Sequence, residues 1–333
     1  MRVLVTGSSG HLGEALVRAL TADGEDVVGL DLLPSPGTSV VGSVSDRDLV
    51  LRSTRGVGAV LHTATLHKPH IGTHGRQAFI DTNISGTLNL LEAAVENGIE
   101  SFVFTSTTSA FGRALTAGTG QSAVWITEDV VSLPRNIYGV TKAAAEDLCE
   151  LFQREYGLPC VVLRVSRFFP EPDDSPEIRQ SYDHLNLKVN ELLYRRVDLE
   201  DVVTAHQLAL ERAPQLGFDR YVISATTPFT PDDVGALATD VPGLVRQLYP
   251  EYEEIYGRLG WTMLPAIDRV YVNARARRHL GWAPRHDFRH ALDCLRSGRD
   301  PRSELALDIG AKGYHAETTG IYTTRTRPRP ART

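Results

Sequence analysis

The chain opens, over residues 2–33, with "RVLVTGSSGHLGEALVRALTADGEDVVGLDLL", and this stretch decides the fold. A short apolar run, "VLV", predicts a buried strand, and three glycines follow it at Gly7, Gly10 and Gly13. Apolar residues then recur at helical spacing through "HLGEALVRAL", and "DVVGLD" predicts a second strand. A glycine turn between a strand and a helix lets a pyrophosphate approach the amides at the helix N-terminus. We therefore predict nucleotide binding here; the simpler alternative is a purely structural glycine turn.

Asp31 ends the second predicted strand, where a carboxylate can accept hydrogen bonds from both ribose hydroxyls of a dinucleotide. The same charge would repel a 2′-phosphate, and no arginine follows at once to reverse this effect. The pattern favours NAD over NADP as cofactor. The alternative is a solvated aspartate at a strand end.

Strand and helix patterns alternate through the first half of the chain, which predicts an α/β fold with a Rossmann-type doubly wound parallel sheet. Further strands are expected at 38–46, 56–65, 100–107 and 158–169. Long helices are expected at 77–98 and around Tyr138, with a loop at 125–136 between them. We assign residues 1–165 to this nucleotide-binding domain.

After residue 165 the pattern becomes more broken, beginning with a proline-rich, charged loop. We predict helices in 199–213, from Thr230 onward, and on both sides of Gly281-Trp282, with a strand at 219–225. These pieces predict a smaller C-terminal α/β lobe over residues 166–315 that binds substrate, with some strands able to return to the main sheet. The basic, proline-containing tail, residues 316–333, is expected to be disordered.

The composition, 42% hydrophobic and 23% charged over 333 residues, is typical of a soluble globular protein. A formal charge of −6 gives no reason to expect nucleic acid or an acidic membrane as a partner. Cys149, Cys160 and Cys294 match no zinc-ligand spacing, so we expect reduced thiols in a cytoplasmic protein. We expect no signal peptide and, without an apolar run of about 18 residues, no membrane span.

Tyr138 and Lys142 lie four residues apart in "PRNIYGVTKAAAEDLCELF", which places them one turn apart on the same side of a helix. An ammonium near a phenol stabilises the phenolate and lowers the tyrosine pKa, which makes a usable base. The alternative is an amphipathic helix that carries both residues by accident. A cofactor site and a third catalytic group elsewhere in the chain favour the catalytic interpretation.

The predicted loop after the fourth strand is rich in histidine, with His67, His70 and His74 following His62. The spacing is irregular and no carboxylate or cysteine joins the group, so we expect no metal site. The loop follows the carboxyl end of a strand, where α/β sheets bind their ligands. We expect either a substrate contact by His67 or Lys68 or a solvated loop.

The motifs "TGSSGHLG", "NISGTLNLLEAA", "FVFTSTTSAFG", "ITED" and "YGVTKAAAE" occur in this order, and with them the chain resembles the extended short-chain dehydrogenase/reductases, specifically the NAD-dependent sugar epimerase/dehydratase family. The resemblance is strong over about 165 residues and weaker beyond them. It implies that Tyr138 is the catalytic acid/base and that Lys142 binds the nicotinamide ribose and lowers the tyrosine pKa. The hydroxyl partner falls on Thr107, with Ser106 as a second candidate.

Together with the glycine turn, the resemblance implies an NAD site that extends along the carboxyl ends of the strands. The residues expected there are Gly7, Ser9, Gly10, His11, Leu12, Gly13, Asp31, Leu32, Ser43, Val44, Thr63, Ala64, Thr65, Asn83, Tyr138 and Lys142. Asn83 is expected in a supporting role beside the active site.

Several positions depart from the family pattern. Family dehydratases carry an Asp-Glu pair after the catalytic threonine, where this chain has Thr108 and Ser109, so dehydration is disfavoured. Arg167 stands where an asparagine is usual. We expect substrate contacts from His67, Lys68, Thr108, Arg167, Arg196 and Arg269. Arginine makes bidentate contacts with phosphate or carboxylate, so these arginines could hold either group of a substrate.

The sequence therefore predicts an NAD-dependent epimerase of a sugar or nucleotide sugar, acting through a transient keto intermediate. The first alternative is a net NAD-dependent dehydrogenase or reductase with the same residues, and the second is an NAD-sensing protein without turnover. The resemblance also implies a homodimer formed through the helices that begin near Gln77 and Asn136.

Overall fold

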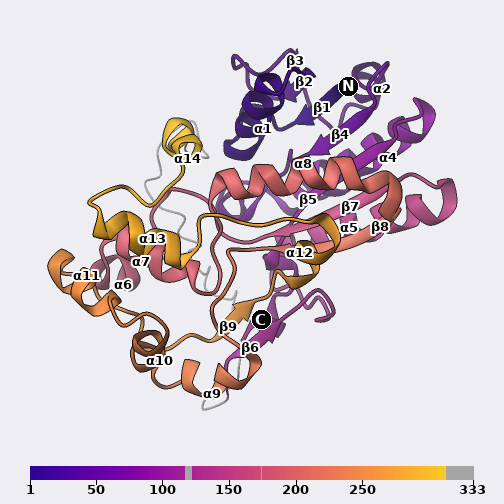
Figure 1. Cartoon of the computed structure of the whole chain (residues 1–333). Coiled ribbons are helices and arrows are strands. Elements are labelled where there is room, and N and C mark those ends of the chain that lie inside the picture. The colour runs from indigo at the N-terminus through magenta and orange to yellow at the C-terminus, as the bar shows by residue number, and fades with distance from the viewer. Residues whose placement is uncertain (117–121, 174, 313–333) are drawn as a thin grey trace, which may run out of the picture.

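The computed structural model describes residues 1–116, 122–173 and 175–312, so the predicted tail at 316–333 lies outside the described residues. Seven strands form one sheet in the order β3-β2-β1-β4-β5-β7-β8, and every neighbouring pair is parallel (Figure 1). The strands are β1 Arg2–Thr6, β2 Asp26–Asp31, β3 Val40–Val41, β4 Ala59–His62, β5 Ser101–Thr107, β7 Cys160–Val165 and β8 Phe218–Ile223.

The apolar strand residues supply two separate cores because alternate side chains point to opposite faces of a sheet. Val3 and Val5 of β1 join a core on one face, and Leu4 joins a core on the other. Helices α1 His11–Ala22, α8 Leu199–Leu216, α12 Ala274–Leu280 and α14 Glu304–Ile309 pack on the first face. Helices α2 Arg47–Ser53, α4 Gly86–Glu96 and α5 Ile137–Tyr156 cover the second. The predicted doubly wound Rossmann-type fold is confirmed.

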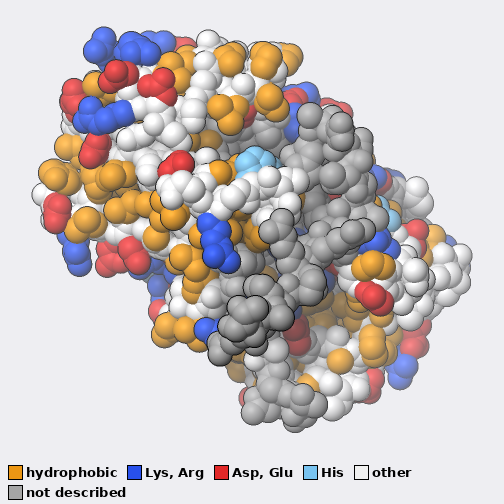
Figure 2. Space-filling view, turned by 180° about the vertical axis from the view of Figure 1, so that it is seen from behind, with side chains coloured by type: hydrophobic (Ala, Val, Ile, Leu, Met, Phe, Trp, Pro, Cys, Tyr) orange, Lys and Arg blue, Asp and Glu red, His pale blue; other side chains and the backbone are white. Residues whose placement is uncertain are grey.

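A third core lies in a lobe beside the carboxyl edge of the sheet. It contains Leu187, Ile255 and Phe288, which come from three helices far apart in the chain. The helices of this lobe are α6 Pro176–Ser181, α7 His184–Leu192, α9 Val234–Leu237, α10 Val241–Leu248, α11 Tyr252–Leu259 and α13 Phe288–Arg296. On the face shown in Figure 2, acidic and basic side chains are interspersed over the described surface.

The structure differs from the predicted elements in four places. Strand β3 has two residues, because the chain bends at Gly42 and turns into α2. The predicted loop at 125–136 begins with the end of β6, Val124–Ile126, which pairs in parallel with β9, Arg269–Tyr271. The predicted helix at 77–98 is α3, Arg76–Ile80, a π-helical turn, and α4. The segment assigned to the C-terminal lobe also supplies α8, which packs on the main sheet, while β8 joins the sheet as the prediction of returning strands allowed.

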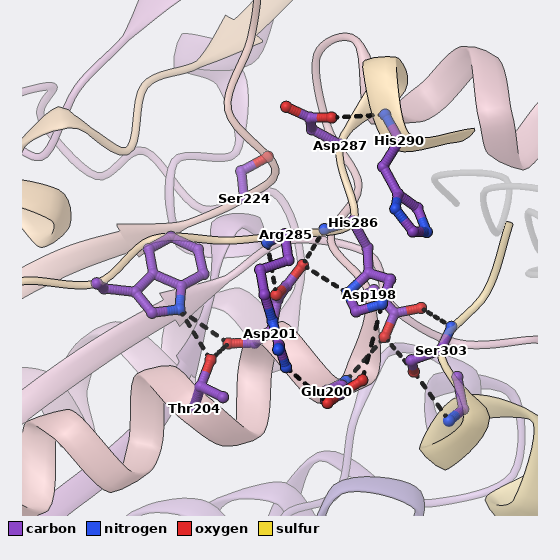
Figure 3. A network of polar contacts seen from close by, with 12 residues as sticks. Asp198, Glu200, Asp201, Thr204, Ser224, Arg285, His286, Asp287, His290 and Ser303 are labelled. Carbon is purple, nitrogen blue, oxygen red and sulfur yellow. Dashed lines mark hydrogen bonds and ion pairs between the residues drawn. The ribbon is translucent and has the colours of Figure 1, made fainter. Parts of the chain in front are cut away.

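A polar network holds the end of the described chain against the start of α8 (Figure 3). Asp198 caps α8 by accepting from the Glu200 amide at 2.8 Å, and it also accepts from the amide and hydroxyl of Ser303. Asp201, which is 1% exposed, accepts from the His286 amide at 2.9 Å and lies 3.3 Å from the His286 ring. The network thus joins α8 to α13 and α14, which follow it in the chain by about a hundred residues.

His286 makes this network sensitive to pH. Burial acts to lower the His286 pKa, but the hydrogen bond to Asp201 and the charges of Asp198, Asp201 and Glu200 outweigh it, so the pKa is raised. For the neighbouring His290, whose ring centroid lies 4.8 Å away, burial and the charge of His286 lower the pKa.

A raised pKa in the folded state contributes stability below the unfolded pKa of about 6.5 and loses it as the pH rises through the folded value. We therefore expect His286→Gln to lower the free energy of unfolding more at pH 5.5 than at pH 8.5, measured by urea denaturation. His290→Gln is the matched control on the neighbouring helix, and its lowered pKa predicts the opposite trend. An equal loss for His286→Gln at both pH values would contradict this prediction.

Candidate active site

A cavity of about 810 Å³ runs along the carboxyl ends of β1, β2, β4, β5 and β7 and is closed on one side by Arg195, Arg269 and Tyr271 of the C-terminal segment. This is the edge at which doubly wound sheets bind ligands, near the point where the strand order reverses between β1 and β4. The volume is within the range of about 300–1,000 Å³ common for ligand and cofactor sites.

Most of the predicted site residues line this cavity. They are Gly7, Ser9, Gly10, His11, Leu12, Gly13, Asp31, Leu32, Ser43, Val44, Thr63, Ala64, Thr65, His67, Lys68, Ser106, Thr107, Thr108, Tyr138, Arg167 and Arg269.

The glycine turn shapes one end of the cavity. Gly7 has a φ of +74°, which favours glycine, and a Cβ at Gly13 would stand 1.8 Å from the Gly7 carbonyl oxygen. The absence of a side chain at Gly13 therefore lets α1 begin directly on the turn. Gly10 is the N-cap of α1 and no side chain caps this end of the helix. The amides of the first turn remain available to an anionic group, which fits the pyrophosphate of a dinucleotide.

Asp31 lies on the wall of the same end, fixed by backbone amides. The Ser9 amide donates to one carboxylate oxygen at 3.0 Å and the Leu33 amide donates to the other at 2.9 Å. Each carboxylate oxygen has a second lone pair, which can accept from a hydroxyl group. This is the arrangement expected for binding the two ribose hydroxyls of NAD.

Tyr138 and Thr107 meet on the opposite wall. Asn136 starts α5 by accepting from the Gly139 amide at 3.0 Å, and this places Tyr138 in the first turn of the helix. A Cβ at Gly139 would stand 2.8 Å from the Ser109 carbonyl oxygen, so glycine allows α5 to approach the end of β5. The side chains of Tyr138 and Thr107 both line the cavity, and they lie close enough for the Thr107 hydroxyl to lower the Tyr138 pKa.

Ser106, the second candidate for the hydroxyl partner, is held by a different group. Its hydroxyl donates to the Glu146 carboxylate, which also accepts from the Arg164 guanidinium at 2.8 Å. All three residues are at least 95% buried. This geometry favours Thr107 over Ser106 as the hydroxyl partner of Tyr138.

Lys142 differs from the prediction. It does not line the cavity, and its ammonium lies 3.9 Å from the centroid of the Phe104 ring. Burial lowers its pKa to about 7, against the opposing charge of Glu146. Burial also raises the pKa of Tyr138 to about 12, and the Thr107 hydrogen bond only partly opposes it. In this structure the loss of solvation dominates the Tyr138 pKa, and the roles expected of Lys142 in ribose binding and in lowering that pKa stay predictions.

Asn83 lies behind the cavity wall and connects its parts. Its carboxamide oxygen accepts from the Leu66 amide at 2.8 Å and the Thr65 hydroxyl at 2.9 Å. Its nitrogen donates to the Leu66 carbonyl at 2.8 Å and to Thr141 at 2.9 Å. Thr141 lies on α5 between Tyr138 and Lys142. Asn83 thus fixes the loop after β4 to the helix that carries Tyr138, without lining the cavity itself.

The arginines at the far end of the cavity also differ from the prediction. Arg167 and Arg269 line the cavity as expected, whereas Arg196 does not and Arg195 takes its place. Arg196 donates to Glu191 at 2.8 Å and to the Phe169 carbonyl at 3.0 Å, which holds it behind the wall. Both residues lie in the turn that follows α7, where their amides donate to the Glu191 carbonyl, and Arg195 alone of the two faces the cavity.

The histidine-rich loop forms the 3₁₀ turn Lys68–Gly72, and the His67 ring stacks on Phe169 with a centroid distance of 5.5 Å. His67, Lys68 and His70 line the cavity. Within residues 1–116, 122–173 and 175–312, no three His, Cys, Asp or Glu side chains are grouped to hold a metal ion.

Sequence reasoning missed several residues that line the cavity. Phe168, Phe169 and Glu171 follow β7, Tyr271 ends β9, and Lys312 closes the described chain. The Lys312 amide donates to the His11 ring at 3.1 Å, and its ammonium pairs with Glu14 of α1. No local sequence pattern predicted that these residues line the cavity, because their positions depend on packing between distant parts of the chain.

Known proteins match the chain at the levels of both sequence and structure. A family model described as "NAD dependent epimerase/dehydratase family" matches residues 3–224. The UDP-glucose 4-epimerase of Halalkalibacterium halodurans is 30% identical over 195 residues, which cover 55% of this chain and 55% of that protein. The chain spans 59%, 55% and 55% of the length of three curated relatives that it matches.

Two solved structures share the fold over most of the chain. A short-chain dehydrogenase/reductase superfamily protein of Agrobacterium tumefaciens, with bound NAD, is 25% identical and has a TM-score of 0.64, with 90% of this chain and 98% of that chain covered. The UDP-glucose 4-epimerase of Thermotoga maritima, with UDP-glucose, is 25% identical and has a TM-score of 0.59, with 90% and 99% covered. The cofactor is NAD, in agreement with the glycine turn and Asp31 of this cavity.

The position of Asp31 predicts the choice between NAD and NADP. We expect Asp31→Asn to weaken NAD binding about 10-fold or more, through loss of charge-assisted hydrogen bonds, and to improve NADP binding relative to NAD. Isothermal titration calorimetry with each dinucleotide measures both effects. Asp26→Asn is the control at the exposed start of the same strand, where Asp26 pairs with Arg2. If Asp31→Asn kept the same preference for NAD over NADP, Asp31 would not determine the choice of cofactor.

Proposed function

The chain belongs to the NAD-dependent epimerase/dehydratase family, and we propose that it epimerises a sugar or nucleotide sugar through a transient keto intermediate. The observation that carries this proposal is the contact between Tyr138 and Thr107 on the wall of a cavity whose other end fits NAD. Bound NAD supplies the hydride acceptor and donor, and the positive charge of its oxidised ring favours a phenolate nearby.

Tyr138 has the acid/base role in this proposal. With its pKa raised to about 12, the phenol is protonated at neutral pH, which is the form that returns a proton to a keto oxygen. In the oxidation step the phenolate takes the proton of the substrate hydroxyl. In this proposal Thr107, which lies beside Tyr138 on the cavity wall, donates a hydrogen bond to the same substrate oxygen.

Dehydration fits the site less well. Thr108 and Ser109 occupy the positions of the acidic pair of family dehydratases, and Thr108 lines the cavity without a carboxylate. The Ser109 amide donates to the Thr107 hydroxyl at 3.1 Å, which fixes the turn after β5. The substrate class is supported by the UDP-glucose bound to one structural relative and the 4-epimerase activity in the names of two.

Net oxidation or reduction by an exchangeable cofactor is the second candidate, and the relationship to a short-chain dehydrogenase/reductase solved with NAD favours it. The two functions differ in the fate of the hydride. An epimerase keeps NAD through gel filtration and interconverts isomers without accumulating NADH. Stoichiometric NADH release with a substrate from a panel of sugars and nucleotide sugars would favour the dehydrogenase.

Replacing the proposed acid/base tests its role directly. We expect Tyr138→Phe to reduce turnover by roughly 100-fold or more while NAD remains bound, because the proton transfer is lost and the cofactor contacts are not. Turnover and bound NAD are measured on the same preparation. Tyr156→Phe is the control, because Tyr156 is the last residue of the same helix and is exposed. If Tyr138→Phe turned over substrate as fast as the wild type, the proposed mechanism would be wrong.

The two hydroxyl candidates can be separated by paired variants. We expect Thr107→Val to lower kcat by about 10-fold or more, since it removes the contact to Tyr138, and to lower the melting temperature less than Ser106→Ala, since its other loss is the single bond from the Ser109 amide. Ser106→Ala should instead lower the melting temperature with a smaller effect on kcat, because it removes a partner of the buried Glu146. Kinetics and thermal unfolding of both variants provide the measurement, and the reverse pattern would assign the role to Ser106.

The assembly and location of the enzyme are further parts of this proposal. We propose a homodimer through α3 and α5, supported by Ile80 and Val140, which expose 36% and 47% of their surface on these helices. We also propose a cytoplasmic location, as the sequence predicts. In the described part of the chain, no helix is long and apolar enough to cross a membrane.

A further inference from the structure

A buried carboxylate holds three arginines together at the far end of the cavity. Glu191 of α7 is fully buried, and its two oxygens contact Arg167 at 3.1 Å, Arg195 at 2.7 Å and Arg196 at 2.7 Å. Asp173 contacts Arg167 at 2.7 Å. Burial acts to raise the Glu191 pKa, but the three guanidinium groups hold it well below its usual range, so the carboxylate is charged.

The direct ion pairs of this cluster leave one guanidinium charge unmatched. Among the described residues, three guanidinium groups contact two carboxylates, Glu191 and Asp173. The carboxylate of Glu171, which lines the same cavity, pairs with His11 instead. Arg269 beside the cluster does not change the count, because Asp268 accepts from it at 2.9 Å and 2.7 Å. A buried excess charge is costly unless a partner approaches it.

The unbalanced charge faces the reacting end of the cavity. Arg167 follows Val165 by two residues, and Val165 pairs with Thr107 in the register of β5 and β7. At about 3.3 Å per residue, Arg167 lies roughly 7 Å beyond the level of Thr107. The Arg167 amide donates to the Arg195 carbonyl at 3.2 Å, so Arg195 is held at the same level. Asp31 and the glycine turn lie at the opposite end of the cavity.

Arg167 and Arg195 also retain hydrogen-bonding capacity toward the cavity. Their side chains line it and are 33% and 22% exposed. The Nε of Arg195 is buried and has no hydrogen-bond partner among the described residues, so a ligand would meet the exposed part of each guanidinium group instead. A carboxylate can accept from two such N–H groups at once.

We propose that Arg167 and Arg195 bind a carboxylate on the sugar itself, close to the carbon that Tyr138 and the cofactor oxidise. The inference rests on the proposed function for the site of reaction. It narrows the substrate class to sugar acids, free or linked to a nucleotide. One excess positive charge matches a carboxylate, whereas a phosphate brings about two negative charges at pH 7. The diphosphate of a nucleotide sugar lies outside the sugar ring and is a separate group.

Binding to an inactive enzyme separates this inference from the proposed reaction. We expect NAD-loaded Tyr138→Phe to bind D-galacturonate or D-glucuronate at least 10-fold more tightly than D-galactose or D-glucose, measured by isothermal titration calorimetry. The pair UDP-glucuronate and UDP-glucose tests the same difference on a nucleotide carrier. Tighter binding of galactose 6-phosphate than of galacturonate would overturn the choice of carboxylate. Equal binding of the acid and neutral members of both pairs would overturn the whole inference.

Variants of the two arginines test whether Arg167 and Arg195 bind the carboxylate. In the same background, Arg167→Met and Arg195→Met should each weaken binding of the acid by roughly 10- to 100-fold and leave binding of the neutral sugar within about 2-fold. Arg246→Met, at an exposed ion pair with Glu253 on the lobe, is the control. If both variants bound the acid as tightly as the parent, the assignment would be wrong. If the acid bound as expected but the wild-type enzyme did not turn it over, the result would contradict the proposed function and leave the binding inference standing.

Discussion

The close contact between the start of α1 and the turn after β1 is the constraint on which the cofactor end of the molecule depends. No side chain fits between Gly13 and the Gly7 carbonyl, so helix and strand meet through backbone atoms alone. That contact brings uncapped helix amides to the edge of the sheet and sets Ser9 beside Asp31. The proposed sites for the pyrophosphate and the ribose therefore depend on one packing requirement.

Much of this arrangement could be predicted from the sequence because its signals are local. The glycines, Asp31, and the spacing of Tyr138 and Lys142 each depend on a few neighbouring residues, and the parallel sheet orders them along one edge. The length of β3 and the strand β6 were not predictable in this way. Strand β6 has three residues, and its partner β9 lies more than a hundred residues further along the chain.

Helical spacing alone did not predict which side chains of α5 face the cavity. Residues four apart share a side of a helix, yet Tyr138 faces the cavity while Lys142 lies over Phe104 and within reach of the charge of Glu146. The sequence pattern did not predict the π-helical turn at Asp81–Ser85. This turn contains Asn83, whose four side-chain hydrogen bonds join α5 to the loop after β4. Such turns often occur at functional sites because they redirect one side chain within a helix. Arg195 and Arg196 are a similar case, since the sequence predicted Arg196 at the cavity and the fold brings its neighbour Arg195 there instead.

The path of the chain limits how the lobe can move. After β7 the chain enters the lobe at α6 and α7, returns to the sheet at α8 and β8, and enters the lobe again at α9. It returns once more at α12 and, after α13, at α14. A domain joined by a single linker can swing about one hinge, but here every crossing would have to bend together. The repeated crossings therefore favour small sliding movements of packed elements over rotation of the lobe about a single hinge.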